Sequence, residues 1–124
     1  MNPTRLDLIR STTIAGARKD LAIPIGEDWS QTFAMTDVLG AAVNITGWTF
    51  ASEVRDSGDV LIATITGAIV SAVGGTFTLS VAKTITEALT ASDALCWDCF
   101  KVDGGEYELM LYGNAEVKAT VTNV

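Results

Sequence analysis

The most informative absence in this 124-residue chain is histidine, of which there is none. Without it, Ser-His-Asp and Cys-His catalytic arrangements, HExxH metal sites and the commonest general base are all excluded. Carboxylates remain as acid-base groups, and the pair Glu106 and Glu108 shares one face of an acidic segment, which is typical of a hydrated surface. The sequence therefore predicts no catalytic, cofactor-binding or metal-binding residue, and we do not expect an enzyme.

Cysteine is also scarce, and the two that occur, Cys96 and Cys99, have CxxC spacing. A closed zinc site would need two further thiolate or imidazole ligands from the same chain, which the sequence lacks. The surrounding residues read as a strand, on which positions three apart face opposite sides, so a redox pair is not favoured either. We expect two buried, reduced thiols, as in a protein assembled in a reducing compartment.

Positive charge is limited to 8 side chains against 15 acidic ones, and the two kinds are unevenly spread. Residues 1–20 carry four basic and two acidic side chains, a net +2, whereas residues 21–124 carry four basic and thirteen acidic ones, a net −9. Because an acidic body repels phosphate backbones, we do not expect nucleic-acid binding. Apolar runs are too short for a membrane span or a secretion signal, so neither a membrane nor an exported location is expected.

What the chain does contain is apolar and polar residues in alternation, with 48% of residues hydrophobic. One face of residues 28–35 carries Trp29, Phe33 and Met35, and Phe77, Leu79 and Val81 recur in the same way. The run from Trp48 to Arg55 puts Trp48, Phe50 and Val54 on one side, and residues 56–59 supply a hairpin turn to a second apolar run, residues 60–66. Short strands separated by turns predict an all-β, antiparallel sandwich.

Several smaller features complete this prediction. Pro24 places residues 21–25 at a sheet edge, and Thr84 with Glu87 suggests a capping box for a short helix over residues 84–89. Three further strands are expected at residues 94–102, 106–112 and 115–122, with turns at residues 103–105 and at Gly113-Asn114. In residues 106–112 the alternation puts Tyr107, Leu109 and Leu111 inward and Met110 outward. A bulge near Cys99 would reconcile two competing inner faces; otherwise Phe100 and Val102 are exposed, as on a partner surface.

The order of these signals across residues 21–122 carries a family resemblance. They are "GEDWSQTFAMTDVLGAAVNITGWTF", "ASEVRD", "GTFTLSV", "TITEAL" and "WDCFKVDGGEYELMLYGNAEVKATVT", with Gly26, residues 44–48 and Arg55 as the matching positions. This pattern resembles a β-sandwich domain of tailed-bacteriophage virion proteins. It is similar to the amino-terminal immunoglobulin-like module of baseplate upper proteins and to small structural proteins next to tail fibres.

The resemblance implies a virion structural protein that docks other virion proteins without catalysis. It would serve as a tail, baseplate or fibre adaptor or as a capsid decoration, assembled in the host cytoplasm as a homo-oligomer within a symmetric assembly. Residues 1–20 are expected to form an extended docking arm and residues 21–124 the immunoglobulin-like sandwich. The arm's docking residues would be Arg5, Leu6, Leu8, Ile9 and Arg10, because burial of its apolar side chains against a neighbour can offset the entropy of ordering it.

A carbohydrate-binding module for host recognition is the alternative, because β-sandwiches often bind glycans through exposed aromatic rings. Its candidates are Trp29, Trp48 and Trp97. Their spacing, in phase with the inward positions, favours a place in the core instead.

Overall fold

The structure, a computed structural model, describes residues 4–6 and 17–119 of the chain. It confirms the all-β prediction, since strands make up most of the described residues and the one helix among them is a single turn. The strands are β1 (Thr4–Leu6), β2 (Ala17–Arg18), β3 (Leu21–Pro24), β4 (Trp29–Met35), β5 (Thr49–Arg55), β6 (Leu61–Ser71), β7 (Thr76–Val81), β8 (Ser92–Asp103) and β9 (Glu106–Lys118). The helix, α1, spans Lys83–Thr86.

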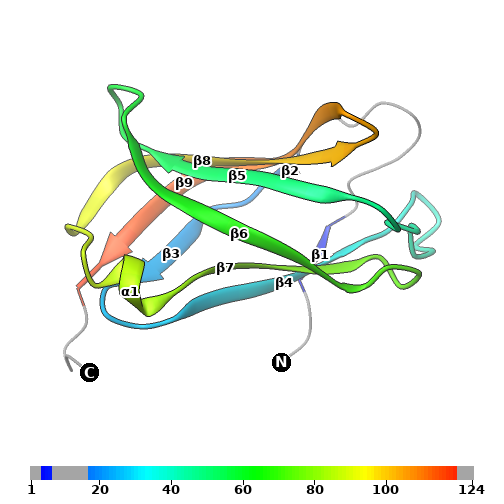
Figure 1. Ribbon diagram of the computed structural model, residues 1–124, viewed down its shortest axis with the longest axis horizontal. Coiled ribbons are helices and arrows are strands. Elements are labelled where there is room, and N and C mark those ends of the chain that lie inside the picture. The colour runs from blue at the N-terminus through cyan, green and yellow to red at the C-terminus, as the bar shows by residue number, and fades with distance from the viewer. Residues whose placement is uncertain (1–3, 7–16, 120–124) are drawn as a thin grey trace.

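The strands form one continuous sheet that curls into a half-barrel, in the order β1-β4-β7-β6-β5-β8-β9-β2, with β3 also paired to β9. The curl depends on β6, which pairs with β5 through residues 61–65 and with β7 through residues 66–71. In Figure 1, β6 crosses diagonally between an upper layer that holds β5, β8 and β9 and a lower layer that holds β4 and β7. The two layers therefore face each other across a common core.

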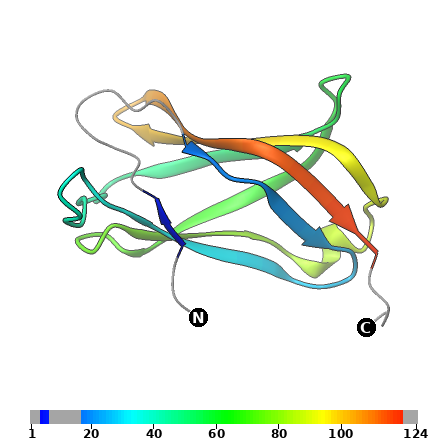
Figure 2. The same cartoon turned by 180° about the vertical axis from the view of Figure 1, so that it is seen from behind.

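The direction of the strands differs between the body and the amino-terminal part. All pairs among β4 to β9 are antiparallel, as predicted. By contrast, β1 runs parallel to β4, and β2 and β3 run parallel to β9 (Figure 2). The amino-terminal strands thus extend both edges of the sheet, and Pro24 lies on an edge strand as its missing N–H requires.

The core lies between the layers and contains the inward residues that alternation predicted on several strands. Buried hydrophobic side chains are Leu21, Ile23, Trp29, Phe33, Ala34, Met35, Ile45, Val54, Ala63, Ile65, Phe77, Leu79, Val81, Leu95, Trp97, Cys99, Met110, Leu111, Ala115 and Val117. Three aromatic rings from the two layers stack on one another in this core. The ring of Phe77 stacks on that of Phe33, with centroids 5.5 Å apart, and on that of Phe50, with centroids 4.6 Å apart.

Phe50 reaches Phe77 because the intervening strand has no side chain in the way. A Cβ built at Gly67 of β6 would lie 2.6 Å from the Cβ of Phe50. Glycine inside a strand often marks such a close approach. The inward direction predicted for Phe50 is therefore correct, and Trp48 is half-buried beside it, with the ammonium of Lys101 4.2 Å from its ring centroid.

A register shift occurs at Cys99, where a bulge was expected in residues 94–102, but its extra residue lies in β9. This shift corrects the faces predicted for β9. Cys99 pairs with Leu111 but Phe100 pairs with Leu109, so Met110 is an extra residue in β9. Met110 and Leu111 are both buried, while Tyr107 is exposed. The prediction of Tyr107 inward and Met110 outward was wrong because the extra residue inverts the alternation on its amino-terminal side.

Two local predictions, a turn and a helix cap, were also wrong. Gly113 and Asn114 form no turn but continue β9, where a Cβ at Gly113 would overlap the carbonyl of Lys19. The helix has no capping box, because its N-cap is Ala82 and Thr84 already lies within α1. The carboxylate of Asp28 instead accepts a hydrogen bond from the N–H of Lys83, at 2.7 Å. Both features depend on residues distant in the sequence.

The turns at residues 56–59 and 103–105 are as predicted. Asp56 Oδ1 accepts hydrogen bonds from the N–H groups of Gly58 and Val60, at 2.8 and 3.0 Å, and so holds the β5–β6 hairpin. Gly104 and Gly105 have φ values of 62° and 85° in the β8–β9 turn. Such positive φ angles cost glycine little.

Candidate functional site

The surface with the most distinctive chemistry is the side of β5, β8 and β9 that points away from the core. We call it the outer face and define it by Ala51, Glu53, Arg55, Asp98, Phe100, Val102, Tyr107 and Tyr112. Strand register brings these side chains together: Ala51 lies opposite Phe100, and Glu53 lies opposite Asp98. The other side of the same strands carries buried residues such as Val54, Trp97 and Leu111, so the outer face is a by-product of the period-two alternation.

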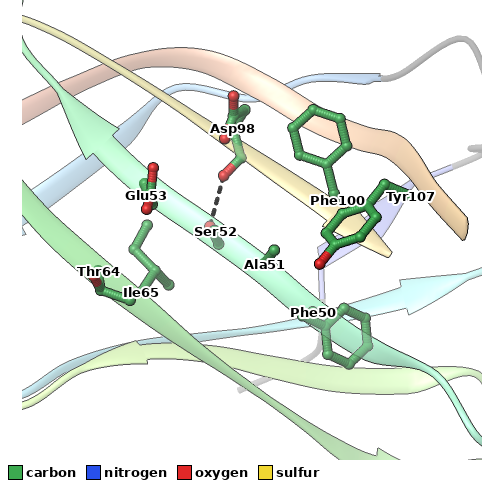
Figure 3. A pocket seen from close by; sticks show the side chains of 9 residues that line it. All are labelled: Phe50, Ala51, Ser52, Glu53, Thr64, Ile65, Asp98, Phe100 and Tyr107. Carbon is green, nitrogen blue, oxygen red and sulfur yellow. Dashed lines mark hydrogen bonds between the residues drawn. The ribbon is translucent and has the colours of Figure 1, made fainter. Parts of the chain in front are cut away.

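A hollow of about 390 Å³ opens on this face. Its lining residues are Phe50, Ala51, Ser52, Glu53, Thr64, Ile65, Asp98, Phe100 and Tyr107. Figure 3 shows Ala51 in the middle, with the rings of Phe100 and Tyr107 toward one end and the carboxylate of Glu53 with Asp98 toward the other. The hollow exists because the small side chain of Ala51 lies between much larger neighbours.

The aromatic end of the hollow results from the bulge in β9. Tyr107 pairs with Val102 and has 65% of its surface exposed. Phe100 is half-buried on the neighbouring strand. An exposed aromatic ring beside a partly exposed one is the kind of surface that proteins use for contacts with partners. The sequence predicted Phe100 and Val102 on an outward surface if residues 94–102 contained no bulge. The extra residue lies in β9 instead, and both side chains are half-buried on the outer face.

The acidic end holds two carboxylates and one guanidinium. The side chain of Arg55 is bound by Glu53, whose Oε1 accepts from Nη2 at 2.6 Å and from Nε at 3.0 Å. Arg55 Nη1 also donates to the carbonyl of Asp59 at 2.9 Å, which fixes the guanidinium toward the β5–β6 hairpin. Glu53 and Asp98 are like charges directly opposite each other on adjacent strands, an arrangement that is unfavourable unless a cation compensates it.

Asp98 is the least satisfied of these groups. Its carboxylate makes no hydrogen bond or ion pair with any residue that the structure describes, whereas its main-chain carbonyl accepts a bond from the buried Ser52 hydroxyl at 2.7 Å. Partial burial, together with the charge of Glu53, raises the pKa of the Asp98 carboxyl, and Arg55 opposes this shift. A positive charge brought close to Asp98 would therefore be stabilised.

The cysteines lie on the two sides of β8, as the strand prediction required. Cys99 is buried, and burial raises the pKa of its thiol to about 12, so it is not a nucleophile at neutral pH. The prediction that both thiols are buried was wrong for Cys96, which is exposed on the outer side of β8. Its Sγ lies 3.6 Å from the carbonyl oxygen of Arg55. Within residues 17–119, no group of three His, Cys, Asp or Glu side chains is arranged to hold a metal ion.

Of the predicted docking residues, only Arg5 and Leu6 fall within the described part of the chain. They belong to β1, where Arg5 pairs with Ala34 and Leu6 with Met35 along the edge of β4. Leu8, Ile9 and Arg10 lie outside the described residues, so their role stays a prediction. No helix in the described ranges has the length and apolar character needed to cross a bilayer.

The end of the predicted arm, residues 17–20, is attached to the body by specific contacts. Trp97 Nε1 donates a hydrogen bond of 2.6 Å to the carbonyl of Lys19. Asp20 Oδ1 accepts a bond of 3.0 Å from the N–H of Asn114. Gly113 permits the close approach, since any side chain there would meet the main chain of Lys19.

The tryptophans proposed for glycan binding are not on an open surface. Trp29 and Trp97 are buried, and Trp48 is half-buried beneath Lys101. Of the aromatic side chains on the outer face, Tyr107 and Tyr112 are exposed and Phe100 is half-buried. The ambiguous phase of residues 95–102 could have indicated Phe100, whereas the outward direction of Tyr107 depends on the extra residue in β9.

Comparison with known protein families and with curated proteins gave no match to either.

Proposed function

We propose that this chain is a structural protein of a tailed-bacteriophage virion, which docks other virion proteins and carries out no catalysis. The observation that carries the docking role is the outer face, where the exposed ring of Tyr107 and the half-buried ring of Phe100 border one end of a hollow that Asp98 lines at the other. Hollows that combine aromatic and charged groups suit partner residues that act as anchors. The virion assignment comes from the sequence resemblance across residues 21–122.

The same proposal includes the immunoglobulin-like sandwich. It is supported by the opposed layers of β4 and β7 on one side and β5, β8 and β9 on the other, and by the core between them (Figure 1). The chain would be assembled in the host cytoplasm, as a homo-oligomer in a tail, baseplate, fibre adaptor or capsid decoration. The acidic body, net −9 over residues 21–124, supports protein partners over nucleic acid.

The test is to locate the chain in purified particles and to measure its native mass in solution. A labelled antibody should mark one symmetric position on intact particles, and native mass spectrometry should give a closed oligomer. A chain absent from particles and monomeric at all concentrations would contradict the proposal.

The arm is tested separately by its apolar residues. Replacing Leu6, Leu8 and Ile9 by serine should leave a folded body, because residues 17–119 contain the buried core, but should abolish assembly. Replacing Ser11, Thr12 and Thr13 by alanine, which changes three arm residues outside the docking set, is the matched control and should assemble normally. Incorporation of the serine variant into particles at the normal level would refute a docking role for the arm.

A carbohydrate-binding role remains the second candidate, and the observation in its favour is a hollow with the exposed ring of Tyr107 at one end and two carboxylates at the other. Sugars stack on such rings and hydrogen-bond to carboxylates. Binding to a glycan array that is lost in Tyr107→Ala but kept in Tyr112→Ala would favour this role.

A further inference from the structure

We infer that the hollow on the outer face receives a basic side chain, lysine or arginine, from a polypeptide partner. This inference rests on the proposed docking function and names the chemistry of the residue that docks. It is carried by three features of the hollow: its size, its aromatic end and its unbalanced acidic end.

The size of the hollow suits a side chain. Its volume of about 390 Å³ is near the lower limit of the roughly 300–1,000 Å³ typical of sites for small ligands. A single water or a bare ion would leave most of this space unfilled, since one water takes up about 30 Å³ of liquid. An extended side chain with an apolar stem would cover Ala51 at the middle of the hollow.

The aromatic end suits the stem and head of a basic residue. Lysine and arginine lay their methylene groups along apolar surface and keep their charge at its border. Phe100 and Tyr107 offer ring faces for such a stem and for cation–π contact. The protein already contains one contact of this kind, between the ammonium of Lys101 and the ring of Trp48.

The acidic end supplies the charge complementarity. Glu53 and Asp98 line the hollow and bring two negative charges to it, whereas Arg55, which pairs with Glu53, is not among the lining residues. The positive charge of Arg55 is already bound by Glu53 and by the carbonyl of Asp59, which leaves Asp98 without a partner among the described residues. A cation from outside would satisfy Asp98 and relieve its repulsion with Glu53.

The same charges disfavour other occupants. Phosphate groups and anionic lipid surfaces would be repelled by the carboxylates and by the acidic body around them. A neutral sugar could stack on Tyr107 but would bring no charge to Asp98. A basic residue can pack against the rings at one end of the hollow and pair with Asp98 at the other.

The experiment uses two small probes of nearly the same shape, the cation Nα-acetyl-arginine amide and its neutral ureido analogue Nα-acetyl-citrulline amide. Each is titrated at low salt into the full ¹⁵N-labelled chain, and amide shifts are followed by NMR. The arginine probe should shift the amides of residues 51–53, 98–100 and 107 in a saturable way, and the citrulline probe should bind several-fold more weakly. Added salt should lower the affinity for the arginine probe more than the affinity for the citrulline probe.

Three variants locate the site. Asp98→Asn keeps the shape of the side chain and should lower the affinity for the arginine probe by roughly two- to fivefold, as expected for a partly exposed ion pair. Ala51→Leu should abolish binding of both probes by filling the hollow. Glu116→Gln, which changes an exposed carboxylate toward the far end of β9, is the control and should bind like the wild type. Thermal melting of each variant checks that it is folded.

Several results would overturn the inference. Equal affinity for the two probes, unchanged affinity in Asp98→Asn, or shifts in this region with mono- and disaccharides but not with the arginine probe would each do so. The outcome is independent of particle location. A chain found in particles that does not bind arginine would refute the inference alone, and a chain that binds arginine but is absent from particles would refute the proposed function alone.

Discussion

Gly67 is the position at which the curl of the sheet can be tested most directly. It lies in β6 between β5 and β7, and its lack of a side chain lets Phe50 stack on Phe77. In Gly67→Ala the new Cβ would lie 2.6, 2.8 and 2.9 Å from the Cβ, Cγ and Cδ2 atoms of Phe50. All three distances are shorter than van der Waals contact, so the ring of Phe50 would have to move.

The free energy of this change follows from what holds Phe50 in place. Overfilling a packed site costs about 1 to 3 kcal/mol. Displacing the ring also forfeits part of the Phe50–Phe77 stacking, which contributes about 0.5 to 1.5 kcal/mol beyond buried area. Replacing glycine by alanine restores about 0.4 to 1 kcal/mol by restricting the unfolded chain. We therefore expect Gly67→Ala to lower the free energy of unfolding by about 0.5 to 4 kcal/mol.

The assay is urea unfolding followed by tryptophan fluorescence, with the m-value checked for constancy. Gly58→Ala is the matched control, because its Cβ would meet only Asp56 Oδ1 at an ordinary 3.4 Å, and it should change stability by less than about 0.5 kcal/mol.

The decisive comparison is Gly67→Ala in a Phe50→Ala background, where the obstacle is gone. There the substitution should be neutral or stabilising by up to about 1 kcal/mol. If it costs as much in that background as in the wild type, Phe50 does not pack over Gly67 and the curl at β6 is wrong.

Three further predictions concern the site and its support. Asp98→Asn should stabilise the protein at pH 7 and lose this advantage as the pH falls to about 4 and below. The raised pKa of Asp98 means that the folded state disfavours the charged carboxylate, and this penalty disappears once the carboxyl is protonated in both the folded and the unfolded state. Equal urea midpoints for the variant and the wild type at pH 7 would contradict the prediction. Trp97→Phe should lower the free energy of unfolding by about 0.5 to 1.5 kcal/mol or more, because the carbonyl of Lys19 loses its 2.6 Å hydrogen bond from the indole. Thermal melting measures this loss, and an unchanged melting temperature would refute the bond. Iodoacetamide should modify Cys96 alone in the native protein and Cys99 only after unfolding, as counted by mass spectrometry, and rapid double labelling of the native chain would show that β8 is not buried on its inner side.

The sequence was sufficient for features that depend on near neighbours in the chain. Alternation on the strands that became β4 and β7 identified Phe33, Met35, Phe77 and Leu79 as core residues, because period-two spacing assigns side chains to faces without reference to the partner strand. The Asp56 turn was equally readable, since its carboxylate bonds to N–H groups only two and four residues away. The absence of histidine was also readable from the sequence, because composition alone excludes the catalytic and metal-binding arrangements that need an imidazole.

Features that depend on distant residues could be decided only by the tertiary structure. Gly113 looked like a turn residue, yet its role is to admit the main chain of Lys19, which lies far away in the sequence. A bulge was anticipated in residues 95–102, but the extra residue is Met110 of β9, and the outward direction of Tyr107 depends on this register between β8 and β9. A shift of one residue moves every side chain beyond it to the opposite face.

The outer-face hollow belongs to this second group. In the sequence, Ala51 and Tyr107 are ordinary residues of alternating strands, and Asp98 is a single carboxylate between Trp97 and Cys99. They become a site because antiparallel pairing sets β5 beside β8 and β8 beside β9, so that one small residue lies among two rings and two carboxylates. The local pattern determines which side of a strand is polar, but only the pairing of strands decides which side chains meet there, because that pairing is a contact between residues far apart in the chain.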